Sequence, residues 1–185
     1  MSRIPTAIIF GDSWVSMGRK PGYSKIAPVL LGWRGRSMGL GGTGFVAEGP
    51  NGRKPYASRI PELLAAGADV LVLQGSGNDA PFEADEVEAA ADQFLRQVSG
   101  HFQQVYMIGV PWAGKGRQTL HLTNAAYERA AEANGALFVP AENWLDRSHM
   151  KKDDPWHPSH RGHLRMARKV AAGIRRAKHQ AAATV

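Results

Sequence analysis

Residues that together could build a nucleophilic site lie near opposite ends of the sequence. Ser13 follows the apolar run Ala7–Phe10 in the stretch TAIIFGDSWV, and Asp154 and His157 form a D-x-x-H pattern in the stretch DPWH. A serine hydroxyl is a weak nucleophile that needs an adjacent base, which must itself be oriented by a third group. The three-residue spacing lets a carboxylate fold back onto the imidazole, which favours Asp154 over its neighbour Asp153. We therefore expect Ser13 to be a nucleophile, His157 its base and Asp154 the orienting acid.

Donors for a developing oxyanion are available in two glycine-containing motifs. In GLGGTG, Gly42 offers a backbone N–H that no side chain of its own shields, and in GSGND, Asn78 offers its side-chain amide. The backbone N–H of Ser13 is a third candidate donor. Each motif alone is also typical of an ordinary turn, because Gly, Asn, Asp and Ser are common turn residues. The interpretation as an oxyanion hole therefore depends on all the motifs meeting at one place.

Elements that could position these motifs follow from the alternation of apolar runs with helical patterns. The expected strands are Ala7–Phe10, Ser37–Leu40, Val70–Leu73, Val105–Ile108 and Leu137–Val139. The expected helices are Tyr23–Leu31, Tyr56–Ala66, Ala84–Val98, Leu122–Ala133 and Gly162–Ala177. Such alternation predicts a parallel sheet covered by helices on both faces. Ligands of such sheets bind outside the carboxyl ends of the strands, where these motifs fall.

Four other patterns match signatures of different chemistry but lack the context that each signature needs. GLGGTG is not followed by the helix of a dinucleotide site, and GRSMG is not followed by the helix of a nucleophile elbow. GVPWAGKG has glycine where a phosphate-binding loop needs Ser or Thr. His157, His160 and His163 could suggest zinc, but a spacing of three turns their side chains progressively apart. We therefore expect no metal and no cofactor.

The composition indicates a soluble globular protein with one domain over residues 1–185. The hydrophobic fraction is 43% and the charged fraction 21%, which is ordinary for a soluble domain of this length. There are no cysteines, so disulfides, thiol catalysis and cysteine-bound metals are excluded. No apolar run is long enough for a signal peptide or a transmembrane segment. We expect a cytoplasmic protein, although export by another route stays open, and the oligomeric state is not indicated.

The positive charge is concentrated near the C-terminus. The formal net charge is +7, no acidic residue follows Asp154, and Lys and Arg recur from Arg161 to Lys178. Apolar residues recur there at helical spacing: Leu164, Ala167, Val170, Ala171, Ile174 and Ala177. We interpret residues 162–178 as an amphipathic helix with a solvated basic face, followed by a short frayed tail. Contact with nucleic acid or an anionic surface is the alternative, and nucleic acid is not the expected partner.

Taken in order, FGDS, GLGGTG, GSGND and DPWHPSHRGH resemble the four sequence blocks of the SGNH hydrolases, also called GDSL-type hydrolases. The resemblance covers residues 8–163. It implies an α/β fold of the flavodoxin-like kind, namely a three-layer α/β/α sandwich with a five-stranded parallel sheet. Trp14 stands where the family often has leucine, and Ser37 where it often has asparagine. Neither difference removes a catalytic group.

The resemblance also implies roles for individual residues. Ser13, Asp154 and His157 would form the catalytic triad. The oxyanion hole would consist of the Ser13 and Gly42 backbone N–H groups and the Asn78 side chain. The implied activity is hydrolysis of carboxylic esters by a serine hydrolase.

The substrate is less well indicated than the reaction. No lid or long apolar channel is visible, so we expect short acyl esters, above all acetyl esters, on a small molecule or a carbohydrate. Trp14, Trp112 and Trp156 flank the predicted site loops and are expected to bind substrate, because aromatic rings can stack on sugars or line an acyl pocket. A lipase or thioesterase activity stays open. A non-catalytic binding module that uses the basic C-terminal helix is an alternative of a different class.

Overall fold

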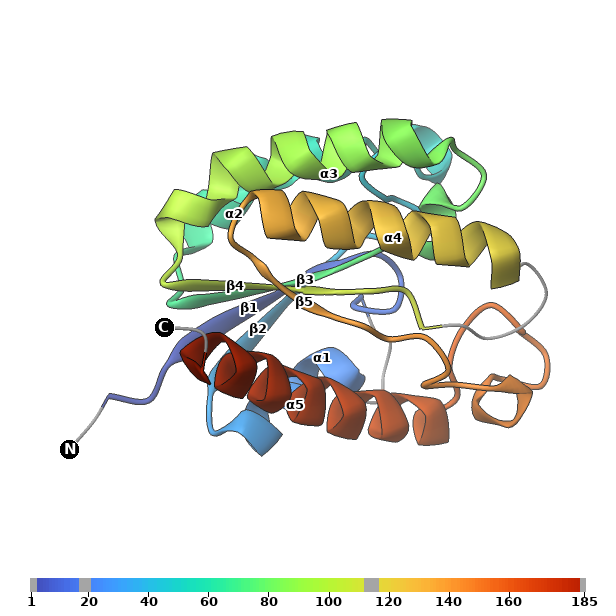
Figure 1. The fold of residues 1–185 in the computed structure, drawn as a ribbon. Coiled ribbons are helices and arrows are strands. Elements are labelled where there is room, and N and C mark those ends of the chain that lie inside the picture. The colour runs from blue at the N-terminus through green and yellow to red at the C-terminus, as the bar shows by residue number, and fades with distance from the viewer. Residues whose placement is uncertain (1–2, 17–20, 112–116, 184–185) are drawn as a thin grey trace.

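Five parallel strands form the central sheet of the protein (Figure 1). The structure is a computed structural model, and it describes residues 3–16, 21–111 and 117–183. The strands lie in the order β2-β1-β3-β4-β5, which is the flavodoxin-like order. Their bounds are β1 Thr6–Gly11, β2 Arg34–Gly39, β3 Val70–Gln74, β4 Gln104–Ile108 and β5 Leu137–Val139.

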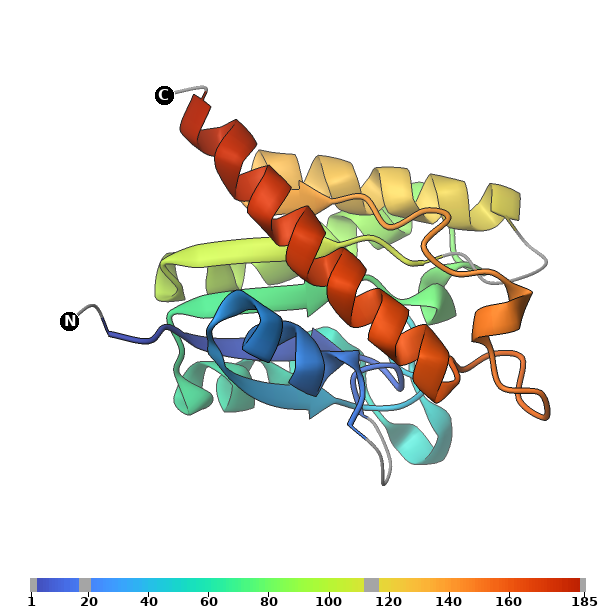
Figure 2. The ribbon, with the colours of Figure 1, turned by 90° about the horizontal axis from the view of Figure 1, so that it is seen from below.

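Helices cover both faces of the sheet, so the fold has three layers (Figures 1 and 2). On one face lie α1 Tyr23–Leu31 and α5 His160–Ala183. On the other face lie α2 Ile60–Ala66, α3 Ala84–Val98 and α4 Arg117–Ala133. Short 3₁₀ turns lie in the connections: η1 Pro50–Gly52, η2 Tyr56–Arg59, η3 Gly77–Asp79, η4 Ser99–His101 and η5 Arg147–His149.

A hydrophobic cluster on each face of the sheet holds the layers together. Successive residues of a strand point to opposite faces, so Phe10 packs toward α3 while Ile9 packs toward α5. The Phe10 ring lies 5.6 Å from the Phe94 ring, centroid to centroid. Val170 and Ile174 of α5 are buried in the opposite cluster. The apolar strands are thus buried on both faces, as expected for a parallel sheet.

The predicted three-layer sandwich with five parallel strands is confirmed, and several boundaries differ from the prediction. The expected strand at residues 37–40 begins three residues earlier, at Arg34. It is an edge strand whose residues Arg34, Gly35 and Arg36 are exposed, so it lacks the apolar run of a central strand. The expected Tyr56–Ala66 helix is divided into η2 and α2. Pro61 lies in the first turn of α2, where its missing backbone N–H is tolerated.

The two last helices are longer than predicted. Helix α4 begins at Arg117 rather than Leu122. Helix α5 runs from His160 to Ala183, so the tail that was expected to be frayed is helical as far as Ala183. Residues 179–183 contain three alanines and no glycine or proline, and alanine is the best helix former. Within the described ranges, no helix has the length and apolar character that crossing a bilayer requires.

Candidate active site

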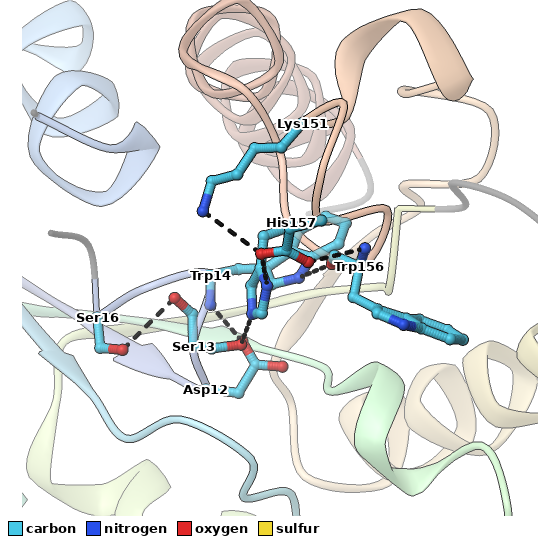
Figure 3. Close-up of polar contacts among 8 residues, drawn as sticks. Asp12, Ser13, Trp14, Ser16, Lys151, Trp156 and His157 are labelled. Atoms are coloured by element: carbon cyan, nitrogen blue, oxygen red, sulfur yellow. Dashed lines mark hydrogen bonds and ion pairs between the residues drawn. The ribbon is translucent and has the colours of Figure 1, made fainter.

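Three side chains from two distant loops form a hydrogen-bonded chain at the carboxyl edge of the sheet (Figure 3). Ser13 follows β1, and its Oγ lies 2.9 Å from Nε2 of His157. Nδ1 of the same imidazole lies 2.7 Å from Oδ2 of Asp154. When Nδ1 carries its proton toward the carboxylate, Nε2 is free to accept the hydroxyl proton. The structure thus brings together the three residues that the sequence pattern singled out.

The loop that carries His157 is held by its own backbone and by the loop after β1. The backbone N–H of Lys151 donates to the carbonyl of His157 at 3.0 Å, and the N–H of His157 donates to the carbonyl of Asp154 at 3.3 Å. Across the site, Nε1 of Trp14 donates to the carbonyl of Trp156 at 3.0 Å. These bonds fix the distance between the hydroxyl and the imidazole without help from a substrate.

The Asp154 carboxyl is held in its charged form. Partial burial alone would raise its pKa, but the hydrogen bond and charge of His157, the Trp156 backbone N–H and the nearby Lys151 ammonium together lower the pKa below its ordinary value. A carboxylate that stays ionised can orient the imidazole and stabilise an imidazolium. The neighbouring Asp153 is exposed and lies outside this hydrogen-bonded chain.

The predicted oxyanion donors line the same cavity as Ser13. Gly42 has φ +81°, and a Cβ at this position would lie 2.6 Å from Cδ of Pro50, so the backbone requires glycine. The Asn78 amide donates to the carbonyl of Thr43 at 3.1 Å and to Oγ of Ser76 at 3.0 Å. These two acceptors lie 3.0 Å apart, so one N–H of Asn78 can bond to both, and the second N–H is left for a group in the cavity.

A buried carboxylate joins the glycine loop after β2 to the loop after β3. Asp79 accepts hydrogen bonds from the backbone N–H groups of Phe45 and Ala47 at 2.7 and 2.8 Å, and from the Tyr127 hydroxyl at 2.7 Å. Gly44 is required beside it, because a Cβ there would lie 2.2 Å from the carboxylate oxygen. The GLGGTG and GSGND motifs are therefore parts of one supporting structure for the site.

Asp12, next to Ser13, is a buried carboxyl beneath the site. It accepts hydrogen bonds from the backbone N–H of Trp14 at 2.9 Å, Nε2 of Gln74 at 3.2 Å and Oγ of Ser76 at 2.8 Å. Burial nevertheless dominates and raises the pKa of Asp12 to about 6, although the bonds from Trp14 and Ser76 act in the opposite direction. The folded protein therefore binds a proton at Asp12 more tightly than the unfolded chain does.

This shift predicts a pH-dependent cost of folding that an Asp12→Asn variant should lack. The contribution of Asp12 to the stability of the native protein should fall as the pH rises from about 4 to about 6, by up to about 3 kcal/mol, and then stay constant. Urea unfolding of the native protein and of the Asp12→Asn variant between these pH values measures the difference in their stability. The variant should gain stability relative to the native protein as the pH rises. A constant difference would contradict the raised pKa of Asp12.

His163 changes the stability in the opposite direction over the same pH range, but it is present in both the native protein and the Asp12→Asn variant. Burial lowers the pKa of His163 to about 4, so this residue favours folding increasingly as the pH rises from about 4 to 6.5. Its contribution cancels in the difference between the two proteins. The comparison with Asp12→Asn is therefore more informative than the native pH profile alone.

A cavity of about 690 Å³ opens beside Ser13 and His157. Its walls include the apolar side chains of Val110, Leu120 and Met150. A volume in this range is typical of small-molecule sites. Ser13 and His157 therefore line a pocket whose walls are partly apolar.

Two of the three tryptophans expected to bind substrate line this cavity. Trp14 and Trp156 do so, and Trp156 is 75% exposed, whereas tryptophan is highly buried on average. The third, Trp112, lies outside the described residues.

Arg53 is a site residue that the sequence analysis did not identify. It lines the cavity, and its Nη1 donates to the carbonyl of Gly41 at 2.9 Å. A Cβ built on Gly41 would lie 3.5 Å from Cβ of Ser13, so Arg53 holds the glycine loop against the serine. In the sequence, Arg53 stands beside Lys54 in a loop and has the pattern of ordinary surface charge.

The three histidines that could have suggested zinc point to different surroundings. His157 bonds to Ser13, while His160 is exposed at the start of α5. His163 is buried, and its Nδ1 accepts the backbone N–H of Tyr23 at 3.4 Å. Over the described part of the chain, no group of three or more His, Cys, Asp or Glu residues is placed to hold a metal ion.

The arrangement of strands and helices is shared with solved hydrolases. LAE5, an alpha/beta hydrolase enzyme from the metagenome of Lake Arreo, is 16% identical, with a TM-score of 0.76 over 91% of this chain and 94% of that chain. Axe2, an acetylxylan esterase from Geobacillus stearothermophilus, is 20% identical, with a TM-score of 0.74 over 92% and 94% of the two chains. At these identities the likeness establishes a common fold. A comparison with curated proteins gives no match.

The sequence itself gives the family. Residues 9–165 match the GDSL-like lipase/acylhydrolase family, and this match includes all of the loops that meet at Ser13. The chain belongs to this family. It is therefore an ester hydrolase of the GDSL type.

Proposed function

We propose that this protein is a serine esterase that removes short acyl groups, above all acetyl, from a carbohydrate by way of an acyl-enzyme on Ser13. The observation that supports the proposal best is the chain of hydrogen bonds from Ser13 through His157 to Asp154. The chain lies at a cavity that is also lined by Gly42 and Asn78. A nucleophile, an oriented base and oxyanion donors are the three parts that acyl transfer needs.

In the first half of the reaction, Ser13 Oγ attacks the ester carbonyl carbon while His157 Nε2 takes the hydroxyl proton. Asp154 stabilises the imidazolium that forms. The negative charge that develops on the carbonyl oxygen is stabilised by the backbone N–H groups of Ser13 and Gly42 and by the Asn78 amide. The tetrahedral intermediate then expels the alcohol, which takes its proton from His157, and the acyl group stays on Ser13.

In the second half, water replaces the alcohol. His157 removes a proton from the water as its oxygen attacks the acyl carbonyl carbon. The second tetrahedral intermediate uses the same oxyanion donors and collapses to release the carboxylic acid. The proton from His157 returns to Ser13 Oγ, so the enzyme is regenerated without a net change in its protons.

A carbohydrate alcohol is supported by an exposed tryptophan that lines the cavity. Trp156 exposes 75% of its surface while its backbone is fixed to the Trp14 side chain. An exposed and anchored indole offers a flat apolar face on which a sugar ring can stack. Among the proteins of the same fold, Axe2 is an acetylxylan esterase, and its solved forms include catalytic mutants with alanine in place of a serine, an aspartate and a histidine.

Hydrolysis of p-nitrophenyl acetate, butyrate and octanoate tests the proposal. The expected result is release of p-nitrophenol well above the rate in buffer, with the highest kcat/KM for acetate. Release of acetate from acetylated xylooligosaccharides would extend the result to carbohydrate. A preference for octanoate would contradict the short acyl group but would leave the serine mechanism intact.

Replacing Asn78 with alanine should lower kcat for p-nitrophenyl acetate by about 10²- to 10³-fold with little change in KM. The amide is expected to bind the oxyanion, which exists only after attack, so the loss should fall on the chemical step. Because the Asn78 amide also bonds to Thr43 and Ser76, the thermal midpoint of the variant must be measured alongside. A folded variant with full kcat would remove Asn78 from the oxyanion hole.

A further inference from the structure

The acidic residues are absent from one helix layer of the protein. The sequence has 16 Asp and Glu residues, but none lies between Asp12 and Glu48 and none follows Asp154. Helices α1 and α5, which form one layer, therefore contain no acidic residue (Figures 1 and 2). The exposed or half-buried cations of this layer, here called the basic face, are Lys25, Arg161, Arg165, Arg168, Lys169, Arg175, Arg176 and Lys178.

The helix layer on the opposite face of the sheet is rich in acidic residues. Helices α2, α3 and α4 carry seven acidic residues: Glu62, Asp85, Glu86, Glu88, Asp92, Glu128 and Glu132. Their cations are neutralised where the structure describes the side chain, since Arg96 pairs with Asp92 and Arg129 pairs with Glu88. In contrast, no cation of the basic face forms an ion pair within the described ranges. The protein is therefore electrically polarised from one helix layer to the other.

The basic face also exposes apolar side chains. Val29 is 73% exposed and Leu30 41% exposed, both in the last turn of α1. Helix α1 packs along α5, and Arg175 of α5 donates a hydrogen bond to the carbonyl of Leu30. The apolar pair and the cations therefore lie together on one surface. Lys25, one turn before Val29, is exposed on the same side of α1.

This combination of charge and apolar surface distinguishes between anionic partners. A nucleic acid or an acidic polysaccharide would use the cations alone and would leave Val29 and Leu30 in water. A lipid surface uses both, because cations are attracted to anionic headgroups while apolar side chains enter the boundary of the acyl chains. The exposed pair therefore favours a lipid surface.

We propose that the basic face docks on an anionic lipid surface, with Val29 and Leu30 entering its interface. The described residues that line the cavity beside Ser13 come from the loops at the carboxyl edge of the sheet, from the end of β3 and from the start of α4, and none belongs to α1 or α5. Docking through these helices leaves the cavity open to substrate. The proposal does not depend on the proposed reaction, and its test needs no ester.

Sedimentation with vesicles tests the docking directly. The native protein should bind phosphatidylcholine vesicles that contain about 30% phosphatidylserine and should not bind vesicles of phosphatidylcholine alone. Raising the salt from about 0.05 M to 0.3 M should weaken binding at least tenfold, because exposed charges are screened. No binding to the anionic vesicles, or equal binding to both kinds, would overturn the proposal.

Matched triple variants test whether the basic face is the surface responsible. Arg168→Gln, Arg176→Gln and Lys178→Gln together should weaken vesicle binding by roughly 100-fold, since each cation near an anionic membrane contributes about fivefold. The control combines Lys54→Gln, Arg96→Gln and Arg129→Gln, which removes the same charge from elsewhere and should bind like the native protein. Equal loss in both variants would show an effect of net charge and would overturn the assignment to this face.

A double variant separates a lipid from other polyanions. Val29→Ser with Leu30→Ser should weaken vesicle binding by about tenfold while the salt dependence stays the same. Unchanged vesicle binding would overturn the lipid assignment, and so would tighter binding of the native protein to duplex DNA than to vesicles. Thermal unfolding of every variant confirms that losses of binding are not losses of fold.

Discussion

Replacing Ser13 with alanine should lower kcat for p-nitrophenyl acetate by about 10⁴-fold or more. The Oγ atom is the only group at this position that can form the acyl-enzyme, and it already lies 2.9 Å from the imidazole that would take its proton. The variant should fold normally, because the serine side chain supports little besides this contact.

Ser16→Ala is the matched control for this experiment. Ser16 is exposed in the same loop, and its hydroxyl donates to the carbonyl of Ser13 at 3.4 Å. Its removal should change kcat less than threefold, because a bond at this distance is weak. Retention of most activity by the Ser13→Ala variant would contradict the mechanism outright.

Replacing Asp154 with asparagine should also lower kcat by about 10⁴-fold, although the shape of the side chain is kept. The carboxylate accepts the proton of His157 Nδ1 at 2.7 Å, and that bond leaves Nε2 unprotonated toward Ser13. An amide in its place can donate to Nδ1, which favours the tautomer with the proton on Nε2. In this tautomer His157 cannot accept the hydroxyl proton. Steady-state kinetics near pH 8 would measure the loss.

Asp153→Asn is the control for Asp154→Asn, because it makes the same replacement of a carboxylate by an amide at the adjacent residue. Asp153 is exposed and contributes nothing to the hydrogen-bonded chain, so kcat should be nearly unchanged. If Asp153→Asn lost activity and Asp154→Asn did not, the geometry of the loop would be wrong. Similar losses in both variants would indicate that the loop tolerates neither change.

The position of the site at the carboxyl edge of the sheet was predictable from the short motifs together with the known location of ligand sites in parallel sheets. Each of Ser13, Gly42 and Asn78 follows a strand, and parallel strands place their carboxyl ends at the same edge. The short D-x-x-H spacing fixed the distance between Asp154 and His157 within one loop. No local pattern shows that His157 lies beside Ser13. The order of the motifs along the chain, which resembles that of the family, predicted this contact.

Features that depend on long-range packing could not be predicted. The contact of Arg53 with Gly41 and the bond between the Trp14 side chain and the Trp156 carbonyl join segments that have no common motif. The raised pKa of Asp12 results from burial by several elements, which the letters GDS do not reveal. The edge strand was misplaced because hydrophobic patterns report burial, and Arg34 and Arg36 are exposed.

The polarised charge of the two helix layers was only partly visible in the sequence. The accumulation of Lys and Arg near the C-terminus was evident, and a solvated helix was its simplest interpretation. The structure adds that the neighbouring helix α1 is also free of acids and exposes Val29 and Leu30 beside Arg175. A linear pattern cannot show that two helices separated by more than a hundred residues form one surface.

The most direct test of the central claim is covalent labelling with a fluorophosphonate, followed by peptide mass spectrometry. Such a reagent reacts with a serine Oγ that an adjacent base has activated, and fluoride leaves. We predict one adduct, on Ser13, which is lost in Ser13→Ala and strongly reduced in His157→Ala. Fragment ions can distinguish Ser13 from Ser16 in the same peptide. Labelling of another serine, or none at all by a folded and hydrolytically active protein, would contradict Ser13 as the nucleophile.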